Sequence, residues 1–193
     1  MVGVVCVRVV FLDDDIVGFL RRVLPKSVVG DAGGGRLAAV LVPLVVAGGI
    51  VRVILIRRGR HLRFHGGEYG FPGGVVEENE SFVEAALREV EEEVGVGREL
   101  IEVLGFLPVV KTLTGFTIVP VVGFLSLPEG FHFKLNQVEV EEVVLAPLLQ
   151  LARNCCRDVF GVYYVFEGRK IWGATARVLS GLFRVLDELA FSE

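Results

Sequence analysis

Three glutamates share one face of a predicted helix. Glu89, Glu92 and Glu93 have the spacing i, i+3, i+4, which brings their carboxylates together on a helical surface. Carboxylates this close repel one another unless a cation lies among them, and their oxygens are the ligands that Mg²⁺ and Mn²⁺ prefer. The pattern therefore indicates a divalent metal site. The alternative is that this acidic face is simply in contact with solvent.

The same segment carries the start and stop signals of a helix. Ser81 and Glu84 have the spacing of a capping box, and Gly95 is typical of the residue that ends a helix. At about 100° per residue, the apolar side chains fall on a face apart from the three glutamates. This predicted core face consists of Val83, Ala86, Leu87, Val90 and Val94.

A glycine-rich turn and a basic stretch precede this helix. The turn Phe71-Pro72-Gly73-Gly74 lets the backbone approach an ion or a phosphate closely. Arginine side chains, whose planar guanidinium groups suit phosphate oxygens, are concentrated just upstream and indicate a phosphate-binding site. The alternative is that this stretch is a solvated loop. The basic residues are Arg57, Arg58, Arg60, His61, Arg63 and His65.

The charge balance makes this basic stretch a local feature. The chain has 20 Lys and Arg against 24 Asp and Glu, a formal net charge of −4. Such a balance gives no overall attraction for nucleic acid, so we expect a small-molecule partner and no nucleic-acid partner.

The helix segment resembles the sequence box of the Nudix hydrolases. Gly74, Glu80 and the run from Arg88 to Val96 stand at the fixed positions of that box. The resemblance implies an α+β fold, an α/β/α sandwich with a mixed β-sheet. It also implies dependence on Mg²⁺ or Mn²⁺ and hydrolysis of a nucleoside diphosphate linked to another group.

The resemblance also implies roles for single residues. Glu89, Glu92 and Glu93 would be metal ligands, and Gly73 would offer its carbonyl oxygen. Glu80 and Arg88 would order the loop and the helix, with Arg88 spaced for an ion pair with Glu84 or Glu92.

The basic stretch resembles the extra motif of the coenzyme A pyrophosphatase branch of this family. Arg58, Gly59, Arg63, Gly67 and the turn 71–74 match it, although Gly59 stands where the branch usually has Ser or Ala, and Ile56 where Thr is common. This implies cleavage of coenzyme A or acyl-coenzyme A to 3′,5′-ADP and a 4′-phosphopantetheine. The predicted substrate-binding residues are Arg57, Arg58, Arg63 and Gly67.

Two other functions stay open at this point. One is hydrolysis of another nucleoside diphosphate derivative such as ADP-ribose. The other is a non-catalytic nucleotide sensor, although such proteins usually lose a carboxylate from the box and here none is missing.

Further carboxylates follow the box. Glu139 and Glu142 lie in a region where Nudix enzymes often have another carboxylate for metal binding or for general-base catalysis, and either residue could have this role. The alternative is that both belong to an exposed acidic strand end. The candidate catalytic residues are therefore Glu89, Glu92, Glu93, Glu139 and Glu142, and the sequence does not decide which of them is the base.

The remaining elements must position this site within one domain. A chain of 193 residues, 52% hydrophobic, predicts a single domain with a full core. We expect residues 1–35, a helix capped by Asp15 and a Gly-rich connection, to belong to the same unit as the hydrolase domain 36–193. The family resemblance runs over about 36–186. The predicted strands are 37–46 and 50–57, forming a hairpin, then 101–111, 116–127 and 159–166, and a closing helix spans 175–189.

Several function classes are excluded on composition and pattern. The uncharged stretch 37–51 is too short for a membrane span, and the N-terminus lacks the basic region of a signal peptide. We therefore expect a cytoplasmic protein without a membrane partner, and a homodimer is compatible with the sequence. Cys6, Cys155 and Cys156 lack metal spacing, and the histidines are too isolated for zinc. Trp172 is predicted to lie in the core.

Overall fold

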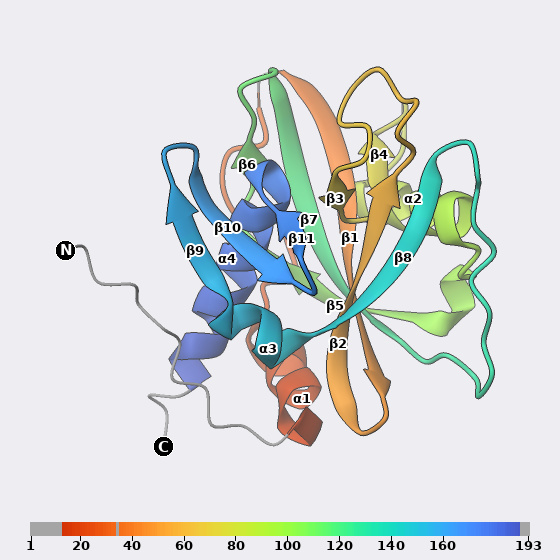
Figure 1. Ribbon diagram of the computed structural model, residues 1–193, viewed down its shortest axis with the longest axis vertical. Coiled ribbons are helices and arrows are strands. Elements are labelled where there is room, and N and C mark those ends of the chain that lie inside the picture. The colour runs from red at the N-terminus through yellow and green to blue at the C-terminus, as the bar shows by residue number, and fades with distance from the viewer. Residues whose placement is uncertain (1–12, 34, 190–193) are drawn as a thin grey trace.

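A computed structural model describes residues 13–33 and 35–189, and its centre is a mixed eight-stranded sheet (Figure 1). The main path of the sheet runs β3-β2-β1-β7-β5, while β4 pairs with β1, β6 with β7 and β8 with β2. The strands are β1 (Arg36–Ala47), β2 (Ile50–Arg58), β3 (Tyr69–Gly70), β4 (Gly73–Val75), β5 (Ile101–Phe106), β6 (Val110–Lys111), β7 (Phe116–Leu125) and β8 (Val140–Pro147).

The predicted hairpin forms the middle of this sheet. β1 and β2 are antiparallel around Gly48 and Gly49, which both have positive φ angles that favour glycine. β1 also pairs in parallel with β7 over ten residues, which makes the sheet mixed. Both strands are apolar along most of their length because both faces of the sheet are covered.

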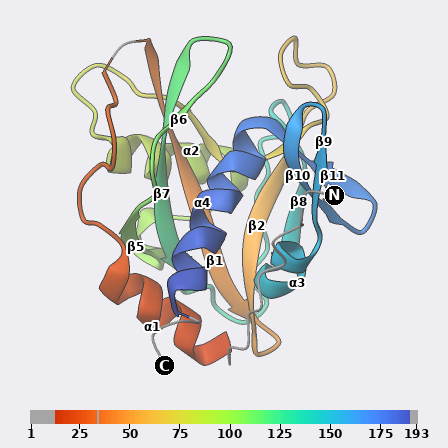
Figure 2. The ribbon, with the colours of Figure 1, turned by 90° about the vertical axis from the view of Figure 1, so that its left-hand side faces the viewer.

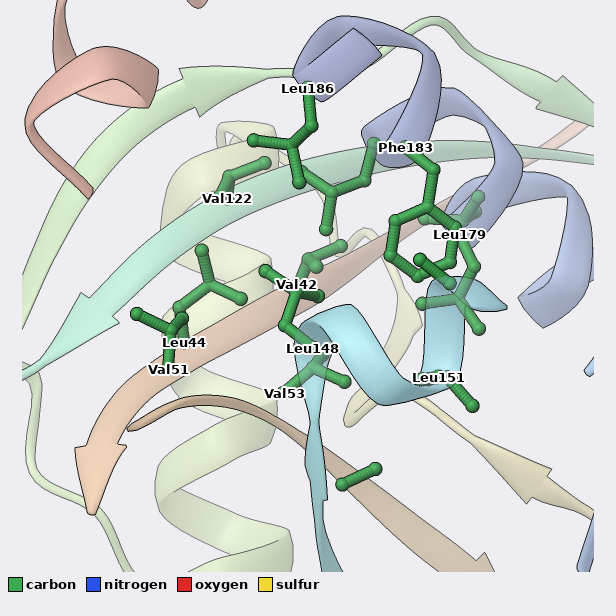
Figure 3. Close-up of a cluster of buried hydrophobic side chains, with 14 of the residues drawn as sticks. Val42, Leu44, Val51, Val53, Val122, Leu148, Leu151, Leu179, Phe183 and Leu186 are labelled. Carbon is green, nitrogen blue, oxygen red and sulfur yellow. The ribbon is translucent and has the colours of Figure 1, made fainter. Parts of the chain in front are cut away.

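Helices cover the two faces. α2 (Phe82–Val94) lies on one face, over a buried cluster that includes Leu41, Ile54 and Val121. α1 (Asp13–Val23), α3 (Leu148–Arg153) and α4 (Gly173–Leu189) lie on the other face, as Figure 2 shows for α1 and α4. The second cluster, seen in Figure 3, joins the sheet to α3 and α4 through Val42, Leu44, Val51, Val53, Val122, Leu148, Leu151, Leu179, Phe183 and Leu186. This arrangement confirms the predicted α+β fold with a mixed sheet.

A second, three-stranded sheet lies beside α3 and α4. It consists of β9 (Cys155–Asp158), β10 (Gly161–Phe166) and β11 (Arg169–Ile171), in the order β11-β10-β9. Its β11 strand lies against β3 of the main sheet. The small sheet therefore borders the loop that leads to α2.

Some local predictions are wrong. Asp15 lies inside α1 rather than before it. Trp172 is 42% exposed, because Ile171 before it points into the core and the chain turns into α4 directly after it. The predicted strand 101–111 is divided into β5 and β6, since Leu107-Pro108-Val109 interrupts the ladder. Cys6 lies outside the described residues. No helix of the described chain is long and apolar enough to cross a membrane.

Candidate active site

The ends of α2 match the sequence signals. Ser81 Oγ accepts a hydrogen bond from the Glu84 backbone N–H (3.2 Å), and the Glu84 carboxylate accepts one from the Ser81 N–H (2.8 Å). Gly95 ends the helix in the left-handed region, with φ 71°, and its N–H donates to the Glu91 carbonyl. The predicted capping box and helix stop are confirmed, and they fix where the acidic residues point.

Glu93 is the buried carboxylate of the site. It is 1% exposed, although the sequence placed it with two glutamates on a face away from the core. A helical wheel does not show this burial, because the turn 71–74 packs along this side of α2, and the Gly73 N–H donates to Glu93 Oε2 at 3.0 Å. Among the described residues, Glu93 Oε1 has no hydrogen-bond partner, and the Arg58 guanidinium lies 3.9 Å away. Burial raises the pKa of Glu93 to about 8.

Glu89 and Glu92 are linked through one arginine. Arg88 Nη1 donates to Glu89 Oε1 (2.9 Å) and to Glu92 Oε2 (3.3 Å), and the same side chain donates twice to Glu80 (2.9 and 3.1 Å). Burial raises the pKa of Glu89, and Arg88 opposes that rise. The predicted ion pair between Arg88 and Glu92 therefore forms, whereas the Glu84 carboxylate accepts a hydrogen bond in the capping box.

The turn needs glycine at two consecutive positions. A Cβ on Gly73 would lie 2.6 Å from Val40 Cα, and one on Gly74 would collide with the Glu89 carboxylate. β4 pairs with the central strand β1 at this point, which holds the turn in the sheet beside α2. The glycines thus let the loop backbone lie directly against the carboxylates.

This donor set fits a hard divalent cation. Glu93 Oε1 is a buried acceptor without a partner in the described chain, and Glu89 and Glu92 lie beside it on α2. Within residues 13–33 and 35–189, no three His, Cys, Asp or Glu side chains enclose an ion in their present rotamers. Arg88 Nη1 instead contacts one oxygen of Glu89 and one oxygen of Glu92.

The two later candidates lie in different surroundings. The charge of Glu139 is close enough to raise the pKa of both Glu89 and Glu93, and its carboxylate accepts from Asn136 Nδ2 (3.2 Å). Glu142 instead accepts from Arg169 Nη2 (2.6 Å) and from the Tyr69 hydroxyl (3.0 Å). Only Glu139 of this pair therefore contributes charge to the buried carboxylate cluster.

The basic stretch forms the end of β2 and the loop after it. Arg57 donates to the Gly67 carbonyl (3.3 Å) and to Glu141 (3.4 Å), while Gly67, with φ 77°, donates to the Arg58 carbonyl (2.9 Å). Arg63 lies over the Phe64 ring, 5.3 Å from its centroid. Arg58 alone of the four predicted substrate-binding residues is paired with a carboxylate of the cluster. The hydrogen bonds between Arg57, Arg58 and Gly67 hold the two ends of this loop together.

A cavity that no sequence pattern indicates lies beside these residues. Its volume is about 480 Å³, and its walls come from two segments about 75 residues apart in sequence, so no local spacing could reveal it. The lining residues are Gly59, Arg60, His61, Leu135, Gln137, Val140 and Glu141.

Comparison with known proteins gives one consistent family. The NUDIX domain model matches residues 35–155. An uncharacterized Nudix hydrolase NudL from Citrobacter koseri is 36% identical over 162 residues, covering 83% of this chain and 82% of that protein. A protein with the same description from Salmonella heidelberg is 39% identical over 177 residues, covering 85% and 91%.

Solved structures agree with this fold. A Caenorhabditis elegans Ap4A hydrolase in a binary complex has a TM-score of 0.56 at 16% identity, covering 82% of this chain and 99% of that one. The Nudix hydrolase RenU from M. smegmatis has a TM-score of 0.55 at 20% identity, covering 84% and 96%. At these identities the likeness concerns the fold alone. The family match and the NudL relatives show that the chain belongs to the Nudix hydrolases, a family that generally uses divalent cations, and that it is a pyrophosphohydrolase of nucleoside diphosphate derivatives.

Proposed function

We propose that this protein hydrolyses the diphosphate of coenzyme A or an acyl-coenzyme A, giving 3′,5′-ADP and 4′-phosphopantetheine or its acyl derivative. One observation carries the proposal: two parts of the branch motif, Arg58 and Gly73, meet at the same buried carboxylate. The Arg58 guanidinium lies 3.9 Å from Glu93 Oε1, and Gly73 donates to Glu93 Oε2. These two motif residues thus border the predicted metal-binding cluster.

Glu89, Glu92, Glu93 and the Gly73 carbonyl would hold Mg²⁺ or Mn²⁺. When bound, the cation neutralises the diphosphate and stabilises the charge that develops on the leaving phosphate. Arg58 is placed to donate to a diphosphate oxygen at the same point, and its planar fork suits that role. Arg57 and Gly67 would hold the loop that presents Arg58, and Arg63 would lie further out along the substrate.

Glu139 suits the general base better than Glu142. A carboxylate that binds a cation is a poor base, so the proton from water is better accepted by a group beside the metal ligands. Glu139 adds charge to the cluster, and its hydrogen bond from Asn136 orients it. Burial opposes ionisation of Glu142, but hydrogen bonds from Arg169 and Tyr69 lower its pKa overall and occupy both of its oxygens.

Turnover of coenzyme A, 3′-dephospho-coenzyme A and ADP-ribose, measured side by side with Mg²⁺ and with Mn²⁺, tests the proposal. We expect the highest kcat/KM for coenzyme A or an acyl derivative, with 3′,5′-ADP as a product. A higher kcat/KM for ADP-ribose would contradict the substrate assignment. Binding without turnover under either metal would contradict catalysis itself.

A further inference from the structure

The cavity of about 480 Å³ beside the carboxylate cluster has no part in the roles assigned above. Its size falls in the range that holds a substantial part of a small ligand. One wall is the turn Gly59-Arg60-His61 after β2, and the other is formed by Leu135, Gln137 and the start of β8. The Gly59 N–H donates to the Glu139 carbonyl (2.8 Å), which ties the two walls together.

The cavity adjoins the site through both walls. Gly59 directly follows Arg58, which reaches toward Glu93, and Val140 directly follows Glu139, whose charge acts on the cluster. We therefore expect one of the two groups attached to a diphosphate at the cluster to reach this cavity.

At the cavity wall, the lining residues Arg60 and Glu141 form an ion pair, and Arg57, which lies outside the lining, contacts the same carboxylate. Arg57 Nη1 and Arg60 Nε both lie 3.4 Å from the same oxygen, Glu141 Oε1, so two guanidinium groups share one carboxylate. The Arg60 side chain is 67% exposed, which leaves its remaining N–H groups able to turn toward a ligand. Gln137 adds an amide donor, while Leu135 and Val140 supply apolar surface.

Because Gly59 has no side chain, the His61 ring can lie against it at this wall. A Cβ at position 59 would lie 2.7 Å from His61 Cε1 and 3.2 Å from His61 Nδ1, so the imidazole occupies the space of a missing side chain. The branch motif usually has Ser or Ala at this position. Any such side chain would displace the ring, which is the movable end of a side chain, and would also lie 3.3 Å from the Val138 carbonyl oxygen.

From these contacts we propose that the cavity binds a phosphate monoester on the nucleotide half of the substrate, and that Arg60 and His61 recognise it. The inference rests on the proposed function, because it assigns the 3′-phosphate of coenzyme A to this cavity. Arg58 then contacts the diphosphate and Arg60 the separate phosphate. The two arginines thus bind different phosphate groups of one substrate.

Arg60→Ala tests this assignment on matched substrates. A charge-assisted hydrogen bond is lost, so kcat/KM for coenzyme A should fall about tenfold to a hundredfold, while kcat/KM for 3′-dephospho-coenzyme A should change little. Gly59→Ala should shift the ratio of the two values in the same direction by a smaller factor. Arg98→Ala is the control, since Arg98 is also exposed with one carboxylate partner, Glu91, but lies outside the cavity lining.

Calorimetric binding of 3′,5′-ADP and of 5′-AMP gives a readout that needs no turnover. The wild-type protein should prefer the bisphosphate, and Arg60→Ala should abolish that preference with unfolding free energy unchanged. Equal losses on both substrates, or a bisphosphate preference that survives in Arg60→Ala, would overturn the cavity assignment and leave the proposed function standing. If the wild-type protein hydrolyses neither substrate, the proposed function fails, and the calorimetric comparison still decides the cavity assignment.

Discussion

Replacing Glu93 with Gln should change how the metal-free protein responds to pH. Glu93 is 1% exposed, one of its oxygens has no partner among the described residues, and burial raises its pKa to about 8. In the unfolded chain this carboxyl has an ordinary pKa near 4.5. Between these two values the folded protein keeps a proton that the unfolded chain has released. Glu93 therefore makes its full contribution to the free energy of unfolding below about pH 4.5. This contribution is lost as the pH rises toward 8.

The size of this effect follows from the pKa difference. Each unit of pKa difference corresponds to about 1.4 kcal/mol. For the metal-free wild type, raising the pH from 5 to 8 should thus remove on the order of 3 kcal/mol. In Glu93→Gln the amide oxygen still accepts from Gly73 and no charge is buried, so this pH-dependent loss should disappear.

Urea unfolding in the presence of EDTA at pH 5, 6.5 and 8 measures the effect. Glu92→Gln is the matched control, because the Glu92 side chain is 57% exposed and the variant should keep the wild-type pH dependence. Both variants should lose nearly all hydrolysis with the fold intact, since each removes a charge from the predicted metal ligands. Equal pH dependence in wild type and Glu93→Gln would refute the reasoning about this buried carboxylate.

Three further predictions concern the cap, the base and the diphosphate contact. Ser81→Ala should lower the free energy of unfolding by about 0.5 to 2 kcal/mol and leave metal affinity little changed, which urea unfolding and a metal titration would measure. If the variant keeps full stability but loses activity, Ser81 is a substrate contact instead. Glu139→Gln should lower kcat with little change in KM, whereas Glu142→Gln should keep kcat; the reverse result would exchange their roles. Arg58→Ala should lower kcat/KM about tenfold to a hundredfold on coenzyme A and 3′-dephospho-coenzyme A alike, and a loss confined to coenzyme A would place Arg58 at the 3′-phosphate instead.

Local signals in the sequence were enough to predict α2 and its ends. The capping box and the C-terminal glycine act within a few residues of one another, so their geometry needs no tertiary contact. The hairpin of β1 and β2 was predictable for the same reason, since Gly48 and Gly49 define the turn between two apolar runs.

Contacts between distant segments decided the rest. Glu93 is buried by a turn some twenty residues away, and a helical wheel of α2 alone does not contain that turn. The pairing of β8 with β2 brings the segment just before β8, with Glu139, beside the end of β2, and it forms two sides of the open cavity; neither arrangement follows from spacing along the chain. Trp172 is exposed because of where β11 ends, although its composition suits a core.

The division of the helices between the two faces affects how this protein could be shortened. The family match covers residues 35–155, yet one face of the sheet is covered by α1, which precedes that segment, and by α4, which follows it. α1 and α4 also contact each other. A fragment limited to the matched residues would expose the apolar side chains that now meet Leu20, Leu179 and Phe183. We therefore expect the cooperative folding unit to be larger than the segment by which the family is recognised, and to include α1 and α4.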